Sequence, residues 1–115
     1  MEQIKGAKYD DGKLQPSLVP PDIITAIAEV RAFGKRKYAD AEDWRSVPRE
    51  KWREALLRHV LAMWDNPLGI DEESGLPVLW HVATNVAFLC SAYKRELEEE
   101  REEARIALNL PMCNE

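Results

Sequence analysis

Cysteine is scarce in this chain, and long apolar runs are missing. The two cysteines, Cys90 and Cys113, are spaced for neither a zinc knuckle nor a disulfide framework. We expect both to be free thiols in a reducing compartment. No apolar run approaches the ~20 residues that span a bilayer, and the polar residues 1–13 lack the apolar region of a secretory signal. The sequence therefore predicts a cytoplasmic protein with no membrane partner.

Several catalytic signatures are also missing. The sequence has no glycine-rich phosphate loop and no Ser-His-Asp set in a recognisable context. Its two histidines, His59 and His81, are not followed by aspartate, which argues against a histidine-aspartate metal phosphohydrolase. The net charge of −5 argues against stable nucleic-acid binding. These absences exclude the classes of enzyme and binding protein that depend on those signatures.

Apolar periodicity predicts an all-α fold, a small helical bundle with one long C-terminal helix in a single domain, residues 1–115. No segment alternates with period two over enough residues to predict a strand. We expect Gly34 to stop the first helix, and residues 34–47 to form a connector. The expected parts are an N-terminal loop over 1–20, a helical core over 21–107 with helices at 21–33, 48–65 and 77–107, and a tail over 108–115.

Polar residues interrupt the apolar stripes of the second and third expected helices. His59 lies in the stripe of the second helix, and His81 and Asn85 lie four residues apart in the stripe of the third. If these helices face each other, the three side chains meet beside the acidic loop 71–75. Buried polar groups need partners, which favours a functional site here. The alternative is a set of buried hydrogen bonds that only ties the helices together.

Charge is unevenly distributed along the chain. Basic residues crowd the middle, from Arg31 to Arg58, and six glutamates lie between Glu96 and Glu103. A basic middle beside an acidic loop suits a small polyanion held together with metal ions. For any single charge, a solvated helix face is the plainer interpretation.

Several short motifs occur here in the order in which they occur in one known family. The chain resembles the phage and prophage dATP/dGTP diphosphohydrolases, which look like distant members of the MazG-like all-α nucleotide pyrophosphatases. Val78 departs from the family pattern, which often has histidine there. The motifs are Lys8-Tyr9-Asp10-Asp11-Gly12-Lys13, Gly34-Lys35-Arg36-Lys37-Tyr38, Asp43-Trp44, Arg58-His59, Asp71-Glu72-Glu73-Ser74-Gly75-Leu76-Pro77, Leu79-Trp80-His81 and Asn85.

The resemblance implies that a deoxypurine triphosphate, dGTP or dATP, is hydrolysed to the monophosphate and pyrophosphate in a bacterial or phage-infected cytoplasm. It also implies Mg²⁺, with Mn²⁺ as the alternative. Such an ion neutralises the triphosphate and activates water, and it prefers oxygen ligands. We expect the metal ligands to be Asp71, Glu72 and Glu54.

The remaining candidate residues would act on the substrate. Glu72, His59 and His81 are the expected catalytic residues. Lysine and arginine side chains suit the phosphates, and an aromatic side chain suits the base. The expected substrate-binding residues are Lys8, Asp10, Lys13, Lys35, Lys37, Arg58, Asn85 and Trp44.

Two other hypotheses remain open. A non-catalytic nucleotide-binding or regulatory protein on the same fold is favoured by Val78. A helical assembly protein is favoured by the long third helix, since its end would overhang shorter partners and isolated helical overhangs are marginal in water. Leu97, Ala104 and Leu108 would then be bare, which predicts a homo-oligomer.

Overall fold

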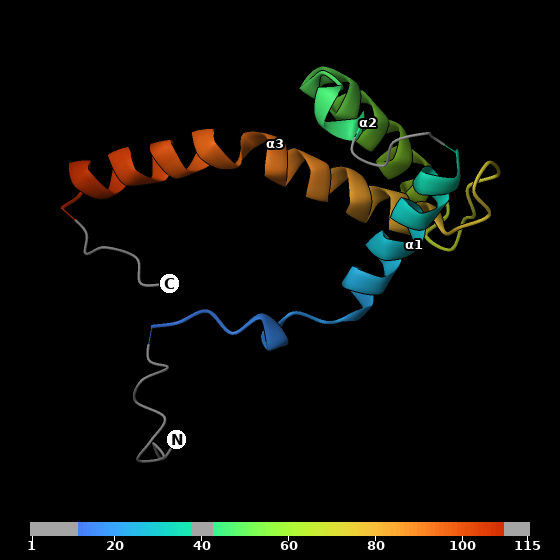
Figure 1. Cartoon of the computed structure of the whole chain (residues 1–115), viewed down its shortest axis with the longest axis horizontal. Coiled ribbons are helices and arrows are strands. Elements are labelled where there is room, and N and C mark those ends of the chain that lie inside the picture. Colours follow the sequence, from blue (N-terminus) through green and yellow to red (C-terminus); the bar gives the residue numbers. More distant parts are fainter. Residues whose placement is uncertain (1–11, 38–42, 110–115) are drawn as a thin grey trace, which may run out of the picture.

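Three α-helices form most of the structure (Figure 1). The computed structural model describes residues 12–37 and 43–109. Within these residues the regular hydrogen-bonded structure besides helices is one isolated bridge, between Ile70 and Pro77. The predicted all-α class with one long C-terminal helix is therefore confirmed. In chain order the elements are η2 (Pro16–Leu18), α1 (Asp22–Lys37), η3 (Asp43–Ser46), α2 (Arg49–Asp65) and α3 (Val78–Ala107).

The first helix is longer than predicted. α1 begins at Asp22 as expected, but it continues through Gly34 to Lys37, so the predicted stop at Gly34 was wrong. A Cβ at Gly34 would meet nothing within 4 Å, and Gly34 lacks the left-handed conformation that ends a helix at a glycine. Glycine inside a helix costs only about 1 kcal/mol, and basic residues in the last turn suit the helix dipole. The extra turn carries Lys37 to the edge of the cavity described below.

Prolines precede the other two helices. Pro48 is the cap residue of α2 and Pro77 that of α3, and neither start has a side-chain cap. Ser74, three residues before Pro77, does not cap α3, and its hydroxyl contacts His81 instead. A proline has no N–H, so each of these helix starts has one unpaired donor fewer, and the Val78 N–H at the start of α3 donates to the Gly69 backbone oxygen at 2.9 Å.

Both α1 and α2 pack on the N-terminal half of α3. Trp80 of α3 donates its indole N–H to Glu29 of α1, with 3.1 Å between Nε1 and Oε2. Arg49 of α2 pairs with Glu96 of α3, and its guanidinium lies 4.5 Å from the centre of the Tyr93 ring. The rest of α3 projects beyond its partners (Figure 1). The two side helices and the near half of α3 therefore form the frame of the site.

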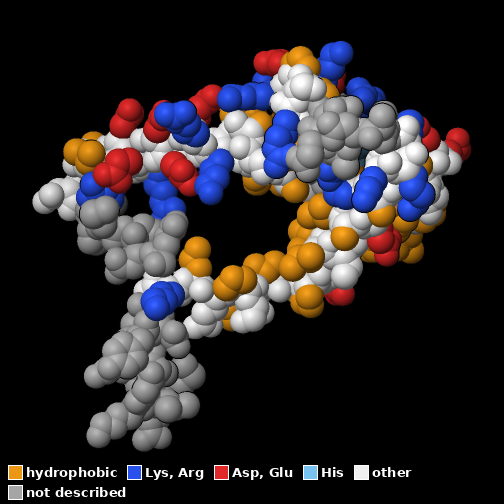
Figure 2. Space-filling view, viewed as in Figure 1, with side chains coloured by type: hydrophobic (Ala, Val, Ile, Leu, Met, Phe, Trp, Pro, Cys, Tyr) orange, Lys and Arg blue, Asp and Glu red, His pale blue; other side chains and the backbone are white. Residues whose placement is uncertain are grey.

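The core of the described chain is thin. The buried residues are Ala26, Val78, Thr84 and Asn85, of which two are polar. Figure 2 shows hydrophobic side chains on the surface beside the start of α1, and charged side chains of both signs along the projecting end of α3. Among the described residues, no helix has both the length and the apolar composition needed to cross a bilayer.

Candidate functional site

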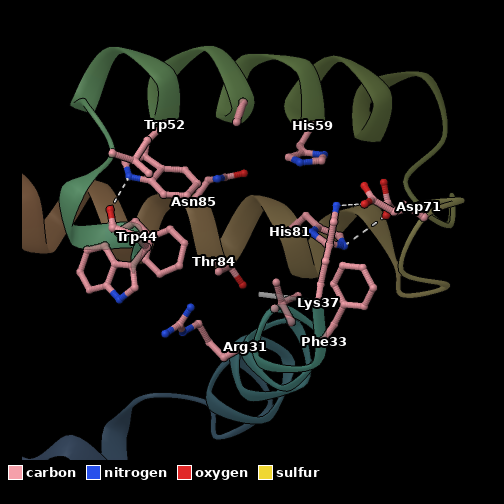
Figure 3. Close-up of a pocket in the computed structure, with 16 residues that line it drawn as sticks. Arg31, Phe33, Lys37, Trp44, Trp52, His59, Asp71, His81, Thr84 and Asn85 are labelled. Carbon is pink, nitrogen blue, oxygen red and sulfur yellow. Dashed lines mark hydrogen bonds and ion pairs between the residues drawn. The ribbon is translucent and has the colours of Figure 1, made fainter. Parts of the chain in front are cut away.

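A cavity of about 350 Å³ lies between α1, α2, α3, η3 and the loop before α3. Figure 3 shows Trp44 and Trp52 at one end of it, and the two histidines with Asp71, Lys37 and Phe33 at the other. Helix α1 contributes two cations, Arg31 and Lys37. An apolar end, a titratable end and two cations in one cavity suit a ligand with a ring and an anionic group.

The two histidines meet across the interface of α2 and α3. Their rings are stacked with 5.0 Å between centroids and 23° between planes. His81 Nε2 lies 2.7 Å from the Ser74 hydroxyl oxygen and 3.6 Å from a carboxylate oxygen of Asp71. The predicted meeting of His59, His81 and the acidic loop is therefore found in the structure.

The loop before α3 is held in a tight turn that fixes Asp71 beside His81. The Asp71 carboxylate accepts the backbone N–H of Ser74 at 2.9 Å, and the Asp71 backbone oxygen accepts the N–H of Gly75 at 2.8 Å. Gly75 has φ of +73°, a left-handed conformation that glycine adopts without steric cost. The Asp-Glu-Glu-Ser-Gly sequence thus shapes this loop as well as supplying charge.

Burial and hydrogen bonding set the protonation of these three side chains. Burial lowers the pKa of both histidines; the charge of His81 lowers that of His59 further, while the charge of Asp71 opposes both shifts. Burial raises the pKa of Asp71, but hydrogen bonds from Ser74 and the positive charge of the two histidines when protonated outweigh it, so the pKa is lowered overall. At neutral pH this end of the cavity therefore holds two neutral imidazoles beside one carboxylate.

Three rings form the opposite end of the cavity. Trp44 stacks on Phe88 with 4.5 Å between centroids and 13° between planes, and Trp52 packs on Phe88 at 4.8 Å and 51°. Trp52 also donates its indole N–H to the Trp44 backbone oxygen at 3.2 Å, which ties η3 to α2. The Arg31 guanidinium lies 5.3 Å from the centre of the Phe88 ring. The three rings are therefore packed against one another and held by η3, α2 and α3, with the Arg45 guanidinium 4.5 Å from the centre of the Trp44 ring.

Asn85 lies on α3 between the two ends of the cavity. Its side chain is 6% exposed, and Oδ1 has no hydrogen-bond partner within the described chain. Its neighbour Thr84 is also buried, but the Thr84 hydroxyl donates to the Trp80 backbone oxygen at 2.9 Å. A buried amide oxygen without a partner is unusual, and it marks Asn85 as a position to explain.

The structure brings some predicted site residues together and leaves others apart. Six of them line the cavity, namely His59, His81, Asp71, Asn85, Lys37 and Trp44. Five are exposed and outside its lining, namely Lys13, Lys35, Glu54, Arg58 and Glu72. Lys8 and Asp10 lie outside the described residues. Val78 is buried and is not part of the lining. The roles assigned to all of these residues stay predictions.

Sequence reasoning missed several lining residues. Phe88 follows Asn85 by three positions and His81 by seven, so the same helical stripe contained the signal. Glu73 lines the cavity and pairs with Lys37, although its neighbour Glu72 was preferred. Arg31 carried no local signal, because only the packing of α1 on α3 brings it to the cavity.

The fit to a metal ion was tested on the available donor side chains. Within residues 12–37 and 43–109, no three or more His, Cys, Asp or Glu side chains are grouped to hold a metal. Asp71 and the two histidines lie close together, but they include only one carboxylate. Mg²⁺ prefers oxygen ligands, so this set suits it poorly. The described side chains alone therefore do not fit a resident Mg²⁺ site.

Comparison with known proteins assigns the chain to a family. The family model described as "dATP/dGTP diphosphohydrolase, N-terminal" matches residues 3–102, so this chain belongs to that family. A protein of Salmonella phage PMBT28 named "dATP/dGTP diphosphohydrolase" is 34% identical over 84 residues. The match covers 73% of this chain and 28% of the phage protein, so the chain spans well under half the length of that relative. No solved structure matches the chain.

Proposed function

We propose that the chain hydrolyses a deoxypurine triphosphate, dGTP or dATP, to the monophosphate and pyrophosphate. The observation that carries this proposal is the cavity with a ring-binding end, a His-His-Asp end and cations from α1. Family membership supports the reaction class, and the name of the phage relative supports the two substrates. The nucleotide enters as its Mg²⁺ complex, with Mn²⁺ as the alternative ion, so part of the metal coordination comes from the substrate phosphates.

The protein groups suit attack by water on the α-phosphorus. A neutral histidine with a lowered pKa can accept the proton that water loses as it forms the new phosphorus–oxygen bond. The bond to the bridging oxygen then breaks and pyrophosphate leaves. Lys37, at the histidine end of the cavity, lies where it can offset the charge of the phosphates. The Ser74 hydroxyl, 2.7 Å from His81 Nε2, holds the His81 ring, and the charge of Asp71, 3.6 Å away, favours the ring once it has accepted a proton.

Hydrolysis in ¹⁸O-labelled water tests the reaction directly. We expect dGTP and dATP to give pyrophosphate and monophosphate, with the label in the monophosphate. Label in pyrophosphate would mean attack at the β-phosphorus, and release of orthophosphate would mean a different hydrolase. Either result would overturn the proposed reaction.

A non-catalytic nucleotide-binding protein is the second candidate. It is favoured by the lack of a three-ligand metal group among residues 12–37 and 43–109. Saturable binding of dGTP or dATP by calorimetry, with no pyrophosphate formed over many hours in Mg²⁺ or Mn²⁺, would support this candidate over the enzyme.

A further inference from the structure

The Asn85 amide is buried at the middle of the cavity without a partner for its oxygen. A buried acceptor left unpaired destabilises the protein, and a hydrogen bond from a ligand would recover that loss. Figure 3 shows the amide between Trp52 and His59, where it faces the space between helices. The torsion at the end of an asparagine side chain is soft, so the amide can turn either its oxygen or its nitrogen towards the cavity.

Position along α3 indicates which part of a nucleotide Asn85 would meet. Phe88, at the end of the cavity formed by the three rings (the aromatic end), lies three residues beyond Asn85. His81, at the end formed by the two histidines and Asp71 (the polar end), lies four residues before it. A helix rises ~1.5 Å per residue, so Asn85 is about 6 Å from His81 along the axis. Flat bases stack on aromatic rings, whereas phosphates need charge and donors. The rings therefore suit the base, and the histidine end with Lys37 suits the phosphates.

We propose that Asn85 reads the purine base in this cavity and that rotation of its amide lets one site accept both adenine and guanine. Adenine presents a donor at N6 beside an acceptor at N1, and guanine presents an acceptor at O6 beside a donor at N1. One amide orientation matches the first pair and the reversed orientation matches the second. This inference rests on the proposed nucleotide substrate and adds how its base is recognised.

The substitution Asn85→Asp tests the inference because a carboxylate only accepts hydrogen bonds. It can take both N1–H and N2–H of guanine, but it faces the N1 lone pair of adenine. Binding of dAMP and dGMP at pH 8 is followed through the fluorescence of Trp44 and Trp52. We expect the ratio of the dAMP dissociation constant to the dGMP one to rise about tenfold or more, since a bidentate contact discriminates by about 1–3 kcal/mol. Asn66→Asp, the same change at an exposed position outside the cavity, should leave the ratio unchanged.

A second measurement uses the unaltered protein, in case the variant does not fold. The deoxynucleoside monophosphate of unsubstituted purine has no group at position 6 and so loses one of the two hydrogen bonds. We expect it to bind about tenfold more weakly than dAMP. Equal binding of these two ligands, or equal weakening of dAMP and dGMP in folded Asn85→Asp, would overturn the base-reading role.

The two proposals fail in different ways. Monophosphates are products and need no turnover, so this binding ratio does not depend on catalysis. Absence of pyrophosphate release with a normal Asn85 response would reject the enzyme and keep the base-reading site. Pyrophosphate release with an unchanged ratio would do the reverse.

Discussion

Replacing Asp71 with asparagine should separate catalysis from folding. The Asp71 carboxylate accepts the Ser74 N–H at 2.9 Å and lies 3.6 Å from His81 Nε2. An asparagine oxygen in the same place can still accept from Ser74, so the turn should survive. What the substitution removes is the negative charge beside the two histidines.

The expected effects differ greatly in size. Loss of one group that positions or transfers a proton lowers kcat by about 10²–10⁴-fold, which corresponds to about 3–5 kcal/mol in activation free energy. The free energy of unfolding should fall by only about 1 kcal/mol, since a neutral acceptor replaces a charged one in a partly exposed pair.

Initial rates of pyrophosphate release from dGTP and dATP measure the first effect, and urea unfolding followed by circular dichroism measures the second. Asp65→Asn is the matched control, since Asp65 is exposed at the end of α2 and outside the cavity. Retention of kcat within threefold in folded Asp71→Asn would refute the reasoning. A loss of rate that merely followed unfolding would refute it as well.

Three further predictions concern pH, divalent cations and self-association. Burial lowers the pKa of His59 and His81 in the folded protein, so the unfolded chain takes up protons first as the pH falls. The free energy of unfolding should therefore drop below about pH 6.5. Urea midpoints at pH 7.5 and 5.5 test this, and equal midpoints would contradict it. Removal of divalent cations with EDTA should stop turnover, and Mg²⁺ or Mn²⁺ should restore it, whereas turnover in EDTA would exclude the metal requirement. We predict a homo-oligomer, because Leu61 and Leu97 are 61% and 56% exposed. Light scattering at micromolar concentration should give a mass at least twice the 13.2 kDa of one chain. Leu61→Lys should lower this mass if α2 forms the contact, and Leu97→Lys should lower it if α3 does.

The helices were predictable because each contains a long apolar stripe with helical spacing. The same stripes placed His59, His81 and Asn85 on facing surfaces, because α2 and α3 follow each other in the chain and pack on each other. Gly34 misled the prediction because its stop signal is local, whereas in the fold it lacks the left-handed conformation that ends a helix at a glycine. Local signals of this kind set helix ends poorly.

The site was only partly predictable. Sequence order placed Asp71 near the histidines, but it could not choose among three adjacent acids, and the turn at Gly75 directs Glu73 rather than Glu72 towards the cavity. Arg31 is remote in sequence from the histidines, so its place depends on how α1 packs. The aromatic end likewise needs η3 to bring Trp44 onto Phe88.

The polar end of the cavity is built from consecutive parts of the chain, and this affects the order in which the protein folds. His59, Asp71 and His81 belong to α2, the following loop and α3, which are consecutive in the chain. Closing the loop of residues 66–77 between consecutive helices costs less entropy than bringing distant segments together, and chains rich in local contacts fold faster. The hairpin can therefore assemble its imidazoles and carboxylate before α1 docks. On this order of events, α1 arrives last and completes the cavity with Arg31 and Lys37.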